Sequence, residues 1–152
     1  MKKYTTLVLS VLCLVVNAQD VAFKKSNFKE DKAGLKEAVS LIEQGDEWLE
    51  KGKAKVLAME YAGDDYKESL QYYLAAQDFN PNSSDLNRKL GHAYLYTNEP
   101  YKAKEFLEKS LELNAEPDPF LYFFLGKAYQ LEQDFEAAER NYLKFGTEAH
   151  SK

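Results

Sequence analysis

The sequence predicts an all-α chain in which about three helix-turn-helix units stack into a solenoid. Residues 90–94, Leu-Gly-His-Ala-Tyr, return at 125–129 as Leu-Gly-Lys-Ala-Tyr, 35 residues later. The same stride separates Ala103 from Ala138. A period of this length indicates repeated supersecondary units, each too small to bury its own apolar face. No run of alternating β-branched residues between tight-turn pairs occurs in the sequence, so strands are not expected.

The first 18 residues have the composition of an export signal. Lys2 and Lys3 precede an apolar run at 7–16, and Val-Asn-Ala at 16–18 forms a cleavage site. Cys13 lies within this run without the small neighbours of a lipobox, so we interpret it as part of the signal peptide. The run is too short to span a bilayer, which needs about 20 apolar residues. We therefore expect an exported protein, periplasmic or outer-membrane-associated, with no membrane span of its own.

Residues 19–32 are expected to form a flexible lead-in, because they carry little apolar content and several lysines. Phe23 and Phe28 could pin this segment loosely to the first helix. The helical domain is expected to cover 33–147, followed by a frayed tail at 148–152.

The first unit is the least regular of the three. Gly45 and Trp48 repeat the Gly-x-x-Tyr spacing, but 20 residues then precede Ser69, where the second unit has eight. Residues 51–65 therefore form either a longer helix or an inserted loop. Pro81 marks the end of this unit, because proline cannot continue a helix.

Helix starts in the second and third units follow from capping residues. Ser-Ser-Asp at 83–85, Asn-Glu-Pro at 98–100 and Asp-Pro at 118–119 each place a capping side chain before a helix. Gly91 and Gly126 lack side chains at positions where two helices are expected to cross closely.

The motif within each unit resembles the tetratricopeptide repeat: Leu-Gly-x-x-Tyr, a small residue nine positions later, and an aromatic or Leu four further on. Asn87 and Phe145 depart from it, standing where the family prefers a bulky aromatic and a small residue. The resemblance implies a concave groove, lined by the first helix of each unit, that binds a protein or peptide partner. The positions it implies for that groove are Arg88, Lys89, His92, Leu95, Tyr96, Phe120, Phe123, Phe124, Lys127 and Leu131.

The composition of this expected groove suggests its occupant. Arg88, Lys89 and His92 bring positive charge, and three phenylalanines offer anchors, so a peptide with apolar and acidic residues would fit. Residues 120–125 are apolar on every side of their helix, which predicts burial all round. Either a partner or a later helix must therefore cover their outer face.

A finer resemblance lies at both ends of the first unit. Four short segments carry this resemblance: 21–28 (Val-Ala-Phe-Lys-Lys-Ser-Asn-Phe), 35–38 (Leu-Lys-Glu-Ala), 45–46 (Gly-Asp) and 72–82. Together these segments are similar to the N-terminal region of Bacteroidota envelope proteins that join such repeats to β-propeller and OmpA-like domains. That similarity implies an alternative role, the N-terminal adaptor of a larger peptidoglycan-anchored outer-membrane assembly.

The remaining residues offer little chemistry. The net charge is −5, and −7 once Lys2 and Lys3 leave with the signal peptide, which argues against nucleic acid and anionic membrane surfaces. We interpret the acidic pairs at 46–47 and 64–65 as helix N-terminal residues, and His92, whose phase points away from the Leu90 face, as solvated or peptide-contacting. We expect no catalytic residue, metal or cofactor. The sequence predicts a non-catalytic interaction scaffold of a bacterial cell envelope.

Overall fold

A computed structural model describes residues 19–114 and 116–150, and these residues are all-helical, as predicted. The predicted signal peptide, Ala115 and the last two residues of the tail lie outside the described residues. The elements are α1 (Lys32–Leu57), α2 (Gly63–Phe79), α3 (Ser84–Tyr94), the short 3-10 helix η1 (Pro100–Lys102), α4 (Ala103–Leu113), α5 (Phe120–Leu131) and α6 (Phe135–Ala149). No helix of this described part is long and apolar enough to cross a membrane.

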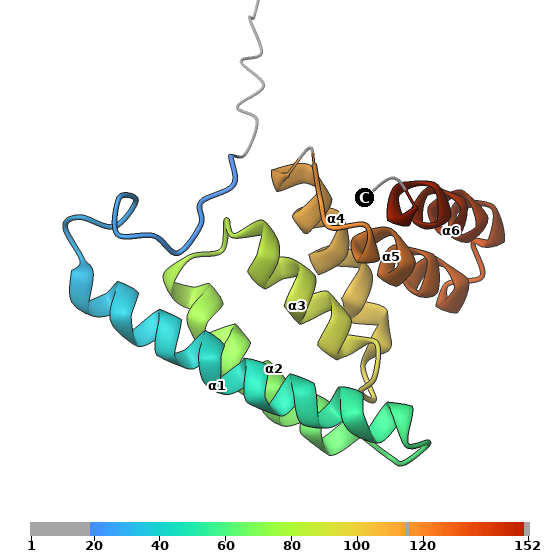
Figure 1. The fold of residues 1–152 in the computed structure, drawn as a ribbon, viewed down its shortest axis with the longest axis horizontal. Helices are drawn as coiled ribbons and strands as arrows, with labels where there is room; N and C mark the ends of the chain where they lie inside the picture. Colours follow the sequence, from blue (N-terminus) through green and yellow to red (C-terminus); the bar gives the residue numbers. More distant parts are fainter. Residues whose placement is uncertain (1–18, 115, 151–152) are drawn as a thin grey trace, which may run out of the picture.

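The six α-helices form three hairpins that stack in chain order. The largest interhelical contacts join α1 with α2, α3 with α4 and α5 with α6, while α2 meets α3 and α4 meets α5 between hairpins (Figure 1). One continuous core of buried side chains runs from Leu49 in α1 to Ala128 in α5. The predicted α-solenoid of three helix-turn-helix units is confirmed.

Glycines set the distance between the helices of each hairpin. A Cβ built on Gly91 would lie 2.4 Å from Leu107 Cγ, and one on Gly126 would lie 2.5 Å from Tyr142 Cε1. Gly45 has the same relation to Tyr73, at 2.5 Å. The glycine of the first unit is thus equivalent to the other two, and its aromatic partner is Tyr73.

Residues 51–65 are mostly helix, which resolves the alternatives for the first unit. Helix α1 continues to Leu57, and a short turn containing Met59, at φ 58°, leads into α2 at Gly63. The end of α1 is held by Lys55, which pairs with Asp65 across the turn.

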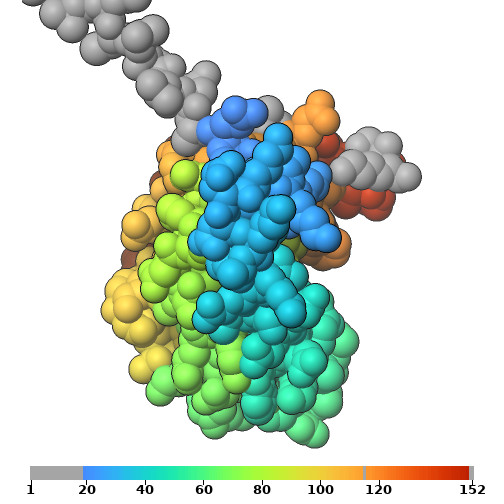
Figure 2. Space-filling view, turned by 90° about the vertical axis from the view of Figure 1, so that its left-hand side faces the viewer, coloured from blue at the N-terminus to red at the C-terminus, as the bar shows by residue number. Residues whose placement is uncertain are grey.

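The lead-in is packed against α2 and the α2–α3 loop rather than pinned to the first helix alone. The main chain of Val21 donates to Asn82 O at 2.8 Å and accepts from the buried side chain of Asn80. Phe23 and Phe28 stack on each other and both contact the ring of Phe79. Figure 2 shows this segment, in blue, against the end of the molecule where α1 begins. Asparagine and phenylalanine contacts hold it despite its polar composition.

Most predicted helix ends are confirmed, and one acidic pair is placed differently. Ser83 caps α3 by accepting from Leu86 N, Asp118 Oδ1 accepts from Phe120 N at the start of α5, and α2 ends two residues before Pro81. The cap predicted at 98–100 is wrong: the 3-10 helix η1 (Pro100–Lys102) precedes α4, and neither η1 nor α4 has a side-chain cap. The pair 64–65 lies in the first turn of α2, but 46–47 lies in the middle of α1, because α1 begins earlier than that interpretation required. Helix α6 runs to Ala149, past the expected domain end at 147.

Candidate groove between the first helices

A groove of about 600 Å³ lies between α1, α3 and α5, the first helices of the three units. Helix α1 forms one wall, α5 the other, and α3 with Tyr66 of α2 lies between them. The lining residues are Asp46, Leu49, Glu50, Lys53, Val56, Leu57, Tyr66, Arg88, Lys89, His92, Tyr96, Asp118, Phe120, Phe123 and Phe124.

Seven of the ten predicted groove residues meet in this cavity: Arg88, Lys89, His92, Tyr96, Phe120, Phe123 and Phe124. The other three lie elsewhere. Leu95 packs against the core, and Leu131 is exposed at the end of α5. Lys127 does not line the cavity, but its ammonium donates to Tyr96 Oη at 2.9 Å and so lies at the groove's edge.

Aromatic rings form the middle of the groove. His92 stacks on Phe124, with centroids 4.1 Å apart, and Tyr66 stacks on Tyr96 at 4.7 Å. His92 also contacts both tyrosine rings, at 5.7 and 5.6 Å. These contacts join α2, α3 and α5 into one apolar surface.

His92 is buried, so of the two alternatives the solvated histidine is wrong, while a histidine that contacts a peptide stays a prediction. Its exposed fraction is 6%, because Phe124 of the next unit covers the ring. His92 lies on a different side of its helix from Leu90, as the sequence predicts. That side faces α5 rather than solvent. Burial, followed by the positive charges of Lys53, Arg88 and Lys127, lowers the pKa of His92 to about 3, so the ring is neutral near pH 7.

The three phenylalanines of α5 have different surroundings. Phe124 is buried, and Phe123 is half-buried against Tyr142 and Phe145 of α6. Phe120 touches Phe145 but keeps 54% of its surface exposed. The later helix α6 therefore covers part of the apolar face, and Phe120 is left as an accessible anchor at the groove wall.

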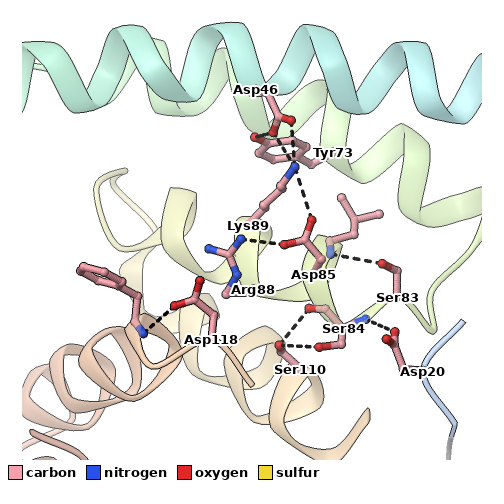
Figure 3. A network of polar contacts seen from close by, with 12 residues as sticks. Asp20, Asp46, Tyr73, Ser83, Ser84, Asp85, Arg88, Lys89, Ser110 and Asp118 are labelled. Carbon is pink, nitrogen blue, oxygen red and sulfur yellow. Dashed lines mark hydrogen bonds and ion pairs between the residues drawn. The ribbon is translucent and has the colours of Figure 1, made fainter. Parts of the chain in front are cut away.

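Charged side chains at one end of the groove are already paired with one another. Lys89 Nζ lies 2.8 Å from a carboxylate oxygen of Asp46 and 3.4 Å from one of Asp85, and Arg88 Nη2 lies 2.6 Å from Asp85 Oδ1 (Figure 3). Tyr73 donates its hydroxyl to Asp46 at 2.7 Å. Arg88 and Lys89 therefore do not bring the free positive charge that their sequence positions suggested.

The network shifts the ionisation of its members. Burial raises the pKa of the Asp85 carboxyl, but Lys89 and Arg88 outweigh it and hold the pKa below its ordinary value. Burial, assisted by the hydrogen bond to Asp46, raises the pKa of Tyr73 above its usual range. The Asp85 carboxylate is thus charged and Tyr73 is protonated near neutral pH.

The wall contributed by α1 was missed by sequence reasoning, because the irregular spacing of the first unit hid its register. A signal was nevertheless present. Gly45 is equivalent to Gly91, so the position after it, Asp46, is equivalent to His92, and Leu49 and Glu50 follow at the spacing of Leu95 and Tyr96. The groove lining confirms all three.

The groove offers binding surface rather than a cluster of reactive groups. Among residues 19–114 and 116–150, no group of three or more His, Cys, Asp or Glu side chains could hold a metal ion.

Comparison with known proteins supports the repeat assignment. Residues 89–117 match the family described as tetratricopeptide repeat, and this segment covers the second half of α3 and all of α4. No curated protein matches the chain. A tetratricopeptide repeat is therefore present within an all-helical solenoid, and repeats of this family generally mediate protein–protein interaction.

Proposed function

We propose that this chain is a non-catalytic interaction scaffold of a bacterial cell envelope, and that the groove between α1, α3 and α5 binds a segment of a protein partner. The observation that carries the proposal is the exposed Phe120 side chain at the edge of a preformed aromatic surface. Across the groove, Val56 and Leu57 of α1 expose further apolar surface. A concave apolar surface with paired charges at one end fits a polypeptide segment better than a flat partner.

The test is capture of a partner from envelope extract by the full chain and three single variants. Phe120→Ala should abolish capture, because truncation of an aromatic anchor costs on the order of 2 kcal/mol at a true hot spot. Tyr101→Ala is the matched control, since Tyr101 is also an exposed aromatic but lies outside the groove. Capture that survives Phe120→Ala and is lost with Tyr101→Ala would contradict the proposal.

Phe123 is less suitable as a probe than its sequence position suggested. Its ring packs on Tyr142 and Phe145, so Phe123→Ala would disturb the α5–α6 hairpin together with any partner contact. Phe120 reports on the groove with little loss of packing.

A second candidate function is the N-terminal adaptor of a peptidoglycan-anchored outer-membrane assembly. The observation that favours it is the outer face of α6, where Phe135 is 65% exposed and Leu143 nearly as much. Helix α4, at the equivalent position, has its outer face packed by α5. Phe135→Ala is the third variant: loss of capture with this variant alone would favour the adaptor function over the groove.

A further inference from the structure

The side chain of His92 is more than nine-tenths buried, yet neither ring nitrogen has a hydrogen-bond partner among the described residues. In that part of the chain, no fully buried side-chain nitrogen or oxygen is left without a partner. Both nitrogens must therefore keep some access to the surface, and His92 reaches it in the groove that it lines. Buried polar groups are normally paired within the protein, so this ring is free to pair with an occupant.

The cations near His92 are less exposed than the carboxylates with which they pair. The side chain of Arg88 is 22% exposed, while that of Asp85 is 61% exposed. Lys53 is likewise less exposed than its partner Glu50. The lining contains three cations, Lys53, Arg88 and Lys89, and three carboxylates, Asp46, Glu50 and Asp118, so these residues together add no net charge.

Lys127 adds a cation without a compensating charge. Within residues 19–114 and 116–150, no carboxylate lies within ion-pairing distance of its ammonium. Its Nζ lies 4.5 Å from the centroid of the Tyr96 ring, and that ring contacts His92. A positive charge held over aromatic rings at the groove's edge is complementary to an anion.

We propose that the groove floor binds a carboxylate of the partner, an Asp or Glu side chain on an otherwise apolar segment, which accepts a hydrogen bond from His92 and faces Lys127. This inference rests on the proposed function of the groove and names what that groove recognises. A hydrogen bond to an ionised group in a site sheltered from water is about twice as strong as a neutral one.

Binding of a carboxylate is coupled to a proton. In the unoccupied groove His92 is neutral, because burial and the neighbouring cations lower its pKa to about 3. A carboxylate beside the ring favours the charged imidazolium, so the occupied groove takes up a proton and binds more tightly as pH falls from 7 toward 5. The titratable and charged groups that line the groove or contact these residues are Asp46, Glu50, Lys53, Tyr66, Arg88, Lys89, Tyr96, Asp118 and Lys127. His92 is the only imidazole among them.

Three probes of equal ring size test the inference: benzoate, benzamide and benzylamine, titrated into the full chain while the imidazole resonances of His92 are followed by NMR. Benzoate should bind at least about tenfold more tightly than benzamide, and benzylamine should bind most weakly. The affinity for benzoate should rise several-fold from pH 7 to pH 5, and that for benzamide should not change.

The control variant is His92→Phe, which keeps an aromatic ring against Phe124 and removes the donor. It should lose both the preference for benzoate and its pH dependence, with an unchanged melting temperature at pH 7 as the check on folding. Equal affinity for benzoate and benzamide, a pH-independent affinity for benzoate, or His92 resonances that respond to none of the probes would each overturn the inference. Partner capture that needs Phe120 but tolerates His92→Phe would overturn the carboxylate site and leave the groove function standing.

Discussion

The imidazole of His92 and the phenyl ring of Phe124 stack across the boundary between the second and third units, with their planes 18° apart. The contact ties α3 to α5 and buries a titratable ring in the groove floor. Because a charged imidazole would lose its hydration here, the stability of the fold depends on the protonation of this one side chain.

Acid should destabilise the fold through His92. The folded ring has a pKa of about 3, against 6.5 in the unfolded chain, so below pH 6.5 only the unfolded chain takes up the proton. The free energy of unfolding should therefore fall by on the order of 2 kcal/mol between pH 7 and pH 5. Urea denaturation at pH 7 and at pH 5 measures this loss of stability. The pKa of Asp85 is lowered from 3.8, so this carboxyl does not titrate between the two pH values. His92→Phe should remove the difference, and an equal slope in both proteins would contradict the assignment.

Two glycines should respond oppositely to the same substitution. Gly91→Ala places a Cβ 2.4 Å from Leu107 Cγ and 3.0 Å from a main-chain oxygen of Ala103, so it should destabilise by about 1–3 kcal/mol. Gly146→Ala meets no atom within 4 Å in the last turn of α6 and should stabilise by at most roughly 0.5–1 kcal/mol. Melting temperatures of the two variants decide the matter, and shifts of the same sign would show that the helix crossing is wrongly placed.

Reversing the charge at Lys89 should weaken the contact between α1 and α3. Lys89→Glu would set a third carboxylate beside Asp46 and Asp85, and we expect a loss on the order of 2 kcal/mol, smaller at high salt. The double variant Lys89→Glu with Asp46→Lys restores the opposite charges and should recover part of the loss. Urea denaturation at low and high salt measures both effects. No recovery in the double variant would show that the pair does not couple the two helices.

The lead-in should detach when Asn80 is truncated. The buried amide of Asn80 donates to Val21 O and its oxygen accepts from Asn82 N, so Asn80→Ala removes two contacts of the α2–α3 loop. We expect a loss of about 1–2 kcal/mol and faster proteolysis at the lysines of the lead-in. Asn98→Ala, at an exposed turn position, is the control. Unchanged proteolysis in Asn80→Ala would mean that the phenylalanine contacts and the main-chain bond from Val21 to Asn82 hold the segment without Asn80.

Export should remove the first 18 residues. The apolar run at 7–16 followed by Val-Asn-Ala predicts cleavage after Ala18, so the mature chain should begin at Gln19. Mass spectrometry of the N-terminus in the periplasmic fraction tests this expectation. A product that keeps Met1 in the cytoplasm would exclude it.

The architecture could be predicted from the sequence alone, because the repeat is a local property of each unit. The stride of 35 residues aligned Gly91 with Gly126 and Ala103 with Ala138, and all four lie at buried helix contacts. Capping at Ser83 and Asp118 was also readable, since a cap depends on the next three residues only. Helix phase also brought seven of the ten predicted groove residues to one cavity.

The contacts of each groove side chain, in contrast, depend on how the helices pack in three dimensions. Asp46 lies 43 residues from Lys89, and Phe124 lies 32 residues from His92, so no local pattern could show that one cation is neutralised and one histidine is covered. The same holds for Asn80, whose partner Val21 is 59 residues away. Periodicity specifies which face of a helix is buried, whereas pairing across faces depends on how the three hairpins are packed. In this chain that packing left Phe120 exposed and His92 open only to the groove.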